Sequence, residues 1–303
     1  AVFAIILFLL MTATGVILTI PYESTYIGES GAEGYYLTAF IWLAAFSTAI
    51  FILGTLYNVL VWMEGRLSES ERDAPKSRKL ILSASRFFRA ILSREFGRQL
   101  RVFLFESVLL QKLLRTSRIR WFLHSMILLG FLGILMLDIV ATLALEIFRL
   151  ESFSDPNGWG KLWIRDFGFD LFGLMILIGL TGAIVRRFVF KPKQLVTGQE
   201  DVVAVLLLLA VVLGGFIQEG LGMNIGLVSH SSPDAYSFVG AAFATILPIV
   251  SVETYAQLWL LHAVLSLALI AYIPFSKLFH LFAAPLANQV DAIIRRRESD
   301  LGR

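Results

Sequence analysis

Six long apolar segments limit the folds that this chain can adopt. Each is close to or longer than the roughly 20 residues that a helix needs to cross the hydrocarbon core of a bilayer. Hydrophobic residues make up 57% of the 303-residue chain, a share typical of membrane proteins. We therefore predict an all-α membrane protein with six transmembrane helices, the last five of which form a bundle. The predicted spans are residues 2–20, 36–62, 121–148, 165–188, 202–220 and 256–283.

Two apolar segments allow other interpretations. Residues 2–20 could be a signal peptide, but no basic residue precedes them and no A-x-A cleavage site follows, so we favour a retained helix. Residues 238–250 are too short to span a bilayer and include Pro248, so we expect a re-entrant or interfacial piece there.

The distribution of Lys and Arg predicts the orientation of the spans. Of the 26 basic residues, 14 lie in 63–120, four in 186–193 and five from Lys277 onward. Because cytoplasmic loops of membrane proteins are enriched in Lys and Arg, these regions and both termini are predicted to be cytoplasmic. The protein is then a multi-pass protein of the cytoplasmic membrane, and its sequence pI of 9.2 requires no nucleic-acid partner. The predicted outer loops are 21–35, 149–164 and 221–255.

The chain divides into four parts on this basis. Residues 1–62 hold two N-terminal transmembrane helices, 63–120 a cytoplasmic amphipathic loop, 121–290 a four-helix core, and 291–303 a cytoplasmic tail. Apolar residues recur at helical spacing in 97–116 and predict an amphipathic surface helix. This helix is either a linker along the membrane or a docking platform for a soluble partner. The basic residues that would face that partner are Arg94, Arg98, Arg101, Lys112, Arg115 and Arg118.

Histidines in the apolar segments are the candidate functional residues. His262 and His280 lie in the last span, 280 − 262 = 18 residues apart, which is five helical turns or about 27 Å on one face. An imidazole in a bilayer is costly and marks a functional site by default. Two such histidines on one face suggest two haems, one in each leaflet.

The second ligand of each haem should lie at the same depth in the bilayer as the first. His124 follows Arg118, Arg120 and Trp121 at the inner end of its span, and His280 follows Lys277 at the inner end of the last span. Both can therefore hold an inner haem between two helices. The alternative is that each is a buried, hydrogen-bonded imidazole.

The outer haem would be held by His262, with His230 in the preceding outer loop as the favoured partner. Met136 and Met223 are the alternatives, since a thioether sulfur also binds haem iron. The chain has no Cys, so neither thiolate-bound iron–sulfur clusters nor c-type haem is possible. Any haem must be b-type.

Three sequence stretches resemble a known family. They are RTSRIRWFLH before the first ligand helix, VRRFVFKPKQLVTGQEDVV in an inner loop, and HAVLSLALIAYIPFSKLFHLFAAP in the last span. Together they resemble the gamma-subunit-like membrane cytochromes b of respiratory nitrate reductase. Within that family the chain looks most similar to the cytochrome subunits of membrane-bound heterodisulfide reductase and of the sulfite-reduction-associated membrane complex.

The resemblance implies that His124 and His280 bind the inner haem and that His262 serves the outer one. It also implies that an arginine of the Arg186–Arg187 pair meets a haem propionate, a pairing that charge chemistry favours independently. The chain departs from the family at Ile134, where nitrate reductase has a second histidine ten residues after the first. The outer haem therefore either has an unusual ligand or is absent.

Polar residues near the outer ends of the spans suggest a quinone site. The resemblance implies that a basic residue at the start of the 165–188 helix contacts quinone. The alternative is an interfacial belt of charges that satisfy one another. The candidates are Asp138, Lys161, Arg165 and Asp166.

These features predict a di-haem cytochrome b subunit of a quinone-linked oxidoreductase in anaerobic respiration. It would transfer electrons between a membrane quinone, with menaquinone expected, and a cytoplasmic iron–sulfur subunit of heterodisulfide-reductase type. Further membrane or outer-side cytochrome subunits are possible partners. The alternatives are a proton or ion transporter that uses its histidines as relay groups, and a membrane anchor without cofactor. Transporter sites lie near the midplane, whereas the polar residues here gather at the two faces.

Overall fold

The computed structural model describes residues 33–62, 75, 77–79, 81–82, 85, 96–155, 157–190, 199–227 and 236–289. The described residues are helical or lie in turns and connections, and none of them forms a strand. Five helices are long and apolar enough to cross a membrane: Ala39–Trp62, Arg118–Leu145, Gly160–Val189, Val202–Asn224 and Val252–Phe275. The all-helical, multi-pass prediction is thus confirmed for the last five spans. The predicted first span, 2–20, lies outside the described residues.

The helices follow one another with few interruptions. The long ones are α2 (Glu33–Trp62), α6 (Arg118–Thr142), α8 (Phe169–Ile184), α9 (Gln199–Asn224) and α11 (Val252–Tyr272). The short α-helices are α4 (Phe96–Val102), α5 (Gln111–Thr116), α7 (Glu151–Ser154) and α10 (Phe238–Ala244). Four π-helical segments are η3 (Phe103–Val108), η4 (Leu143–Ile147), η5 (Gly160–Gly168) and η6 (Val185–Val189). Two 3₁₀ turns, η7 (Ile273–Phe275) and η8 (Lys277–Phe279), follow α11.

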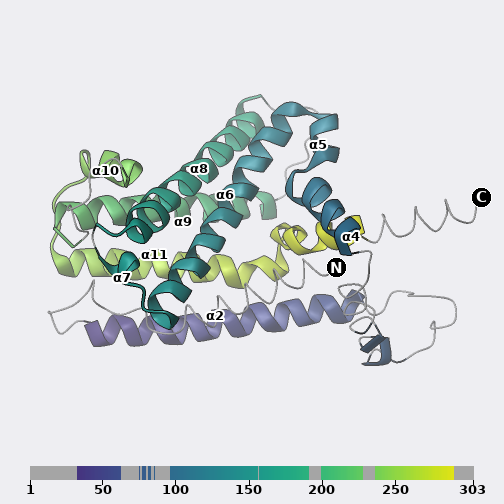
Figure 1. Cartoon of the computed structure of the whole chain (residues 1–303), viewed down its shortest axis with the longest axis horizontal. Helices are drawn as coiled ribbons and strands as arrows, with labels where there is room; N and C mark the ends of the chain where they lie inside the picture. The colour runs from purple at the N-terminus through teal and green to yellow at the C-terminus, as the bar shows by residue number, and fades with distance from the viewer. Residues whose placement is uncertain are drawn as a thin grey trace, which may run out of the picture.

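The long helices pack in a chain of neighbours. α6 lies along α8, α8 contacts α9, α9 contacts α11, and α11 lies along α2 (Figure 1). The short helices α4 and α5 lie at one end of the longest axis, and α7 and α10 lie at the other (Figure 1). By the distribution of positive charge, the α4–α5 end is the predicted cytoplasmic end.

Small residues allow α6 and α8 to approach closely. A Cβ atom on Gly130 of α6 would lie 2.7 Å from the carbonyl oxygen of Phe172, and one on Gly179 of α8 would lie 2.8 Å from that of Leu123. Glycine at such contacts lets two membrane helices pack backbone to backbone. This interface fixes the position of His124 relative to the end of α8.

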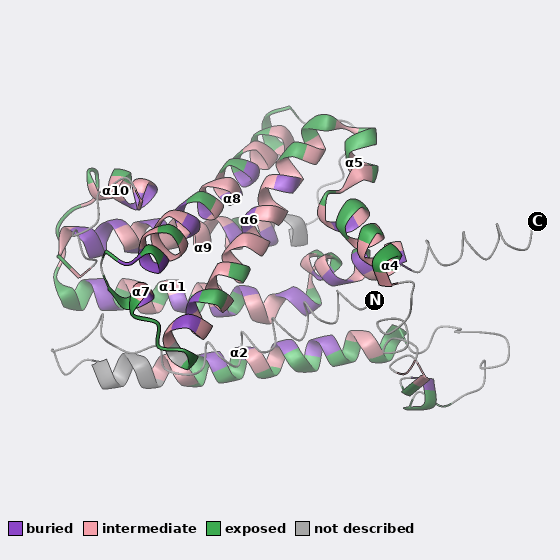
Figure 2. Ribbon diagram, viewed as in Figure 1, coloured by how far each residue is buried: buried purple, intermediate pink, exposed green. Residues whose placement is uncertain are grey.

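Apolar side chains cover much of the outside of the bundle. On α2, Trp42 is 72% exposed and Phe46 is 67% exposed. Exposed and half-buried residues alternate along the long helices with only scattered buried ones (Figure 2). A surface of this kind is suited to contact with lipid chains or with other membrane subunits.

The amphipathic segment 97–116 is not the continuous helix that its periodicity predicts. It consists of α4, η3 and α5, with a sharp turn at Leu110, whose φ of 52° is left-handed. The indole nitrogen of Trp121 donates a hydrogen bond to the carbonyl oxygen of Leu109 at 2.8 Å and holds this turn against the start of α6. At the other end of the segment 97–116, the side-chain amide of Gln289 donates a hydrogen bond to the carbonyl oxygen of Gln99 at 2.9 Å. The segment therefore folds over the inner end of the bundle.

Candidate functional site

The imidazoles of His124 and His280 lie next to one another at the end of the bundle that η3 covers. Their ring centroids are 5.8 Å apart and their planes differ by 30°. A bond between a metal and an imidazole nitrogen is about 2 Å long, so one metal ion between the rings requires a separation of this order. The sequence pairs His124 with His280 because both lie at the same depth in their spans. The structure brings these two histidines together.

A break in the last span sets the position of His280. The span was predicted as one helix over 256–283, but α11 ends at Tyr272 and is followed by η7, η8 and a second helical stretch, 280–289. Pro274 cannot donate a backbone hydrogen bond, and Ser276 is extended, with ψ of 171°. The prediction that His262 and His280 share one face of an unbroken helix is therefore wrong.

A hydrogen bond determines which nitrogen of His280 is available. Its Nδ1 lies 2.5 Å from the carbonyl oxygen of Lys277. Because a carbonyl can only accept, Nδ1 must carry the proton, and Nε2 is left with a free lone pair. Metal-binding histidines usually donate their other ring N–H in this way. His280 is therefore in the tautomer that a metal ligand needs.

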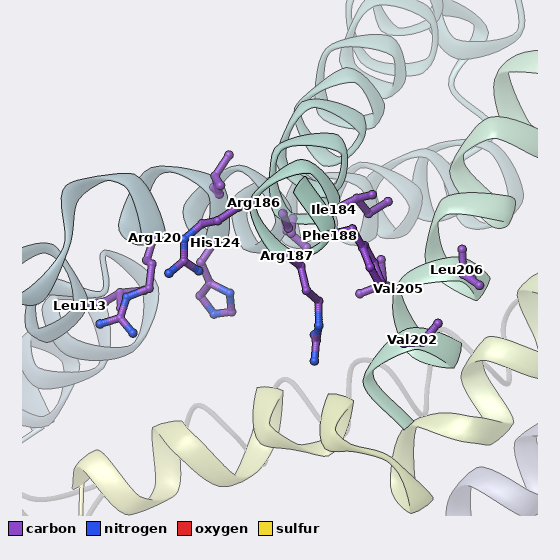
Figure 3. Close-up of a pocket in the computed structure, with 13 residues that line it drawn as sticks. Leu113, Arg120, His124, Ile184, Arg186, Arg187, Phe188, Val202, Val205 and Leu206 are labelled. Atoms are coloured by element: carbon purple, nitrogen blue, oxygen red, sulfur yellow. The ribbon is translucent and has the colours of Figure 1, made fainter. Parts of the chain in front are cut away.

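The largest of three cavities around the pair holds a group of cations. It has a volume of about 310 Å³ and is lined by His124, Arg120, Arg186 and Arg187, with apolar side chains between them. Figure 3 shows these side chains around the same space, with Arg120 and His124 on α6 and the other two arginines on η6.

Two smaller cavities adjoin both histidines. One, of about 80 Å³, is lined apart from the histidines by apolar side chains such as Leu208 and Leu269. The other, of about 100 Å³, lies under η3 and includes Ser107 and Asn288. The space beside the pair is thus cationic on one side, apolar on a second and polar on a third.

These residues fit a planar tetrapyrrole better than a bare metal ion. No group of three or more His, Cys, Asp or Glu side chains that could hold a metal occurs among the residues that the structure describes. Two imidazoles are enough only if the cofactor itself supplies the other ligands, as a haem does. The apolar and cationic walls fit its ring and its two carboxylates.

His262 lies deeper in the bundle and faces α9. Its Nδ1 is buried and has no hydrogen-bond partner among the described residues. A Cβ atom on Gly214 would lie 2.6 Å from this nitrogen, whereas one on Gly215 would lie 3.8 Å from the ring. The imidazole thus occupies a notch that glycine leaves open. A buried polar nitrogen without a partner requires an explanation, such as a ligand that satisfies it.

The sequence offers three partners for His262, namely His230, Met136 and Met223, and the structure describes the last two. His230 lies outside the described residues, so its pairing with His262 stays a prediction. Met136 is 56% exposed on the outside of α6, which argues against it as a ligand. Met223 is 6% exposed in the outer part of α9.

Most of the predicted quinone residues contact one another or the nearby backbone. Lys161 and Asp166 make an ion pair of 2.7 Å, with side chains only 8% and 15% exposed. A guanidinium nitrogen of Arg165 donates to the carbonyl oxygen of Phe153 at 3.1 Å. Asp138 is half-buried on α6. Three of the four residues thus have partners within the protein, as expected for charges that satisfy one another.

A buried carboxyl pair connects α8 and α9. Asp170 is 1% exposed, hydrogen bonds to Glu219 of α9, and accepts from the backbone nitrogen of Val239 at 2.6 Å. A Cβ atom on Gly240 would fall within 2.5 Å of the Glu219 carboxyl group. Spacing along the chain cannot reveal this pair, because its members come from different helices.

Comparison with known proteins assigns the chain to a family. The family model described as nitrate reductase gamma subunit matches residues 108–299, more than half of the chain. The chain belongs to the nitrate reductase gamma subunit family. The match includes His124, both arginines of η6, His262 and His280.

The curated relatives belong to redox complexes. The dihydromethanophenazine:CoB--CoM heterodisulfide reductase of Methanosarcina mazei has a subunit that is 27% identical over 260 residues, covering 81% of this chain and 89% of that protein. The subunit of the same name from Methanosarcina barkeri is 24% identical and is covered over 94% of its length. The EtfAB:quinone oxidoreductase of Syntrophomonas wolfei is 31% identical over 180 residues, 54% of this chain but only 24% of that protein. No solved structure matches the chain. The family and these names support a membrane electron-transfer subunit.

Proposed function

We propose that this protein is a di-haem cytochrome b that passes electrons between a membrane quinone and a cytoplasmic iron–sulfur subunit. The observation that carries the proposal is the facing pair His124 and His280, with Nδ1 of His280 bonded to a carbonyl and Nε2 free. Haem supplies one-electron redox chemistry when bound, and the protein supplies ligands, charge and exclusion of water.

The residues around the pair have distinct roles in this proposal. Nε2 of His280 and a ring nitrogen of His124 hold the inner haem from α6 and the end of the last span. The arginines of η6 bind its propionates, because bidentate guanidinium–carboxylate contacts are strong and planar. The apolar cavity wall excludes water from the ring.

The outer half of the proposal rests on His262. Its buried, unpartnered Nδ1 and the notch at Gly214 support a ligand there, with His230 as the second histidine. Quinone would bind near the outer end, close to Lys161, Arg165, Asp166 and Asp138. The printed names of the relatives support an electron donor or acceptor of the quinone class and support partner subunits.

The experiment that tests the proposal is haem analysis of the purified complex. His124→Ala and His280→Ala should each remove one b-type haem per chain, and His262→Ala should remove or alter the other. Phe122→Ala is a matched control, since this side chain lies two residues from His124 and is 47% exposed. Full haem content in either inner variant, with the helices inserted, would refute the inner site. A colourless wild-type protein would favour a cofactor-free anchor or a transporter.

A further inference from the structure

We infer that Arg120 completes a three-arginine anion site, with Arg186 and Arg187, which binds the carboxylates of the inner haem and orients its ring. The inference rests on the proposed function and extends it to Arg120, to which the family resemblance assigns no role.

The position of Arg120 on α6 is the first argument. Arg120 precedes His124 by four residues, so the two side chains lie one turn apart on the same face of the helix. Both line the cavity of about 310 Å³. A group held by His124 in this cavity therefore lies within the region that the Arg120 side chain can reach.

The second argument is the convergence of charge from two separate elements. The other two arginines lie on η6, where the backbone nitrogen of Phe190 donates to the carbonyl oxygen of Val185 in an i→i+5 bond of 3.3 Å. Such π turns change the direction in which side chains leave a helix and often occur at functional sites. Here both arginines of the turn line the same cavity as Arg120 (Figure 3).

The third argument is that Arg120 and Arg186 have no described partner of opposite charge. Both side chains are half-buried. The rest of the cavity wall is apolar except for His124. Like charges around a partly dry cavity repel one another, so an anion in that cavity would stabilise the arrangement. The two carboxylates of a haem have the required charge.

The other two cavities offer no cation to a carboxylate, because neither is lined by Lys or Arg. The cavity under η3 is lined by Glu106, whose carboxylate forms an ion pair with Lys112 at 2.7 Å. The cavity toward the bundle interior is apolar apart from the two histidines. A haem held by the pair would therefore find partners for its carboxylates at the arginines and apolar contacts at Phe131, Leu208 and Leu269.

Redox titration of the inner haem in the intact complex tests this assignment. Arg120→Gln should lower the midpoint potential, because a nearby positive charge favours the less positive ferrous form. The potential should also become more dependent on pH, since a propionate that loses its guanidinium partner takes up a proton more readily. Arg120→Lys keeps the charge and should return the potential toward the wild-type value. Arg149→Gln is the control, because Arg149 is exposed and does not line the cavity.

The outcomes separate this inference from the proposed function. A wild-type protein without an inner haem would refute both. If haem-loaded Arg120→Gln protein has the same potential and pH dependence as Arg149→Gln, the three-arginine site alone is refuted. Loss of co-purified phospholipid phosphorus from Arg120→Gln, with an unchanged potential, would assign the cations to a lipid headgroup instead. If Arg120→Gln does not accumulate in the membrane, Arg120→Lys decides the question. A midpoint potential of Arg120→Lys equal to that of the wild type supports the site. Loss of haem from Arg120→Lys, despite its retained charge, contradicts the site.

Discussion

The side-chain amide of Asn288 donates a hydrogen bond to Oγ of Ser107 at 3.2 Å, across 181 residues of sequence. Its oxygen accepts from Nζ of Lys112 at 3.0 Å. Asn288 thus connects the last helical stretch to η3 and α5, directly beside the cavity that contains His124 and His280. The amphipathic segment is held over the proposed haem site by specific polar contacts and not by apolar packing alone.

Replacing Asn288 should loosen this cover. We expect Asn288→Ala to reduce stability by about 1–2 kcal/mol, because it removes several hydrogen bonds at once. The inner haem should then be released faster when the detergent-solubilised protein is heated. Gln111→Ala is the control, since Gln111 lies on α5 beside Lys112 without a side-chain hydrogen bond to the described residues. Equal rates of haem loss in the two variants would show that the contact is not needed.

Substitutions at two adjacent glycines in α9 distinguish a specific role of His262 from a general effect on helix packing. Gly214→Ala places a Cβ atom 2.6 Å from Nδ1 of His262, whereas Gly215→Ala places one 3.8 Å from the ring, an ordinary contact distance. Both changes raise helix propensity by up to about 1 kcal/mol, so that contribution cancels in the comparison. We expect Gly214→Ala alone to shift or abolish the outer redox step, with the inner step unchanged. Identical titration curves for the two variants would remove His262 from the outer site.

The structure revises the choice of residues for partner docking. Lys112 is held by Glu106 and Asn288, so it is a poor candidate for a partner contact. Arg101, Arg115 and Arg118 are exposed on the same segment. Changing these three to Glu should slow haem reduction by the soluble partner about tenfold or more at low salt, because charge steers association. Reduction by quinol should stay normal, and the defect should shrink as salt is raised. An unaffected partner reaction would leave the segment as a membrane-surface linker.

The pair Lys161–Asp166 tests whether the outer charges serve stability or quinone binding. Lys161→Met leaves a mostly buried carboxylate without its partner and should cost about 3–5 kcal/mol of unfolding free energy. The double variant Lys161→Met with Asp166→Leu removes both charges and should recover most of that loss. Thermal unfolding and quinol-dependent haem reduction should be measured on both. Recovered stability with quinol reduction still impaired would assign Lys161 to the quinone site, whereas recovery of both would make the pair structural.

Part of the candidate site could be predicted because charged residues reveal depth in a bilayer. Arg118 and Arg120 mark the predicted inner end of one span and Lys277 marks that of another, so the sequence predicts His124 and His280 at one level of the bilayer. Their 5.8 Å separation agrees with this prediction. An unbroken last helix is a wrong prediction, because α11 ends at Tyr272, just before Pro274.

The contacts between helices could not be predicted in the same way. Periodicity gives the face on which a residue lies but not the helix opposite it, so neither the Gly214 notch at His262 nor the Asp170–Glu219 pair could be derived. Leu110 illustrates a second limit, since a left-handed φ at leucine is a local strain that only the surrounding contacts maintain.

The sequence by itself determined the five apolar helices long enough to span a membrane and predicted their orientation and the candidate ligand histidines, because hydrophobic length and charge placement are local properties. The tertiary structure alone decided which side chains meet: the break after α11, the π turn that brings Arg186 and Arg187 to the cavity of Arg120, and the cover that Asn288 holds in place. The physical reason is that helix crossings are set by close packing at small residues such as Gly130 and Gly179, where a shift of one turn changes every partner.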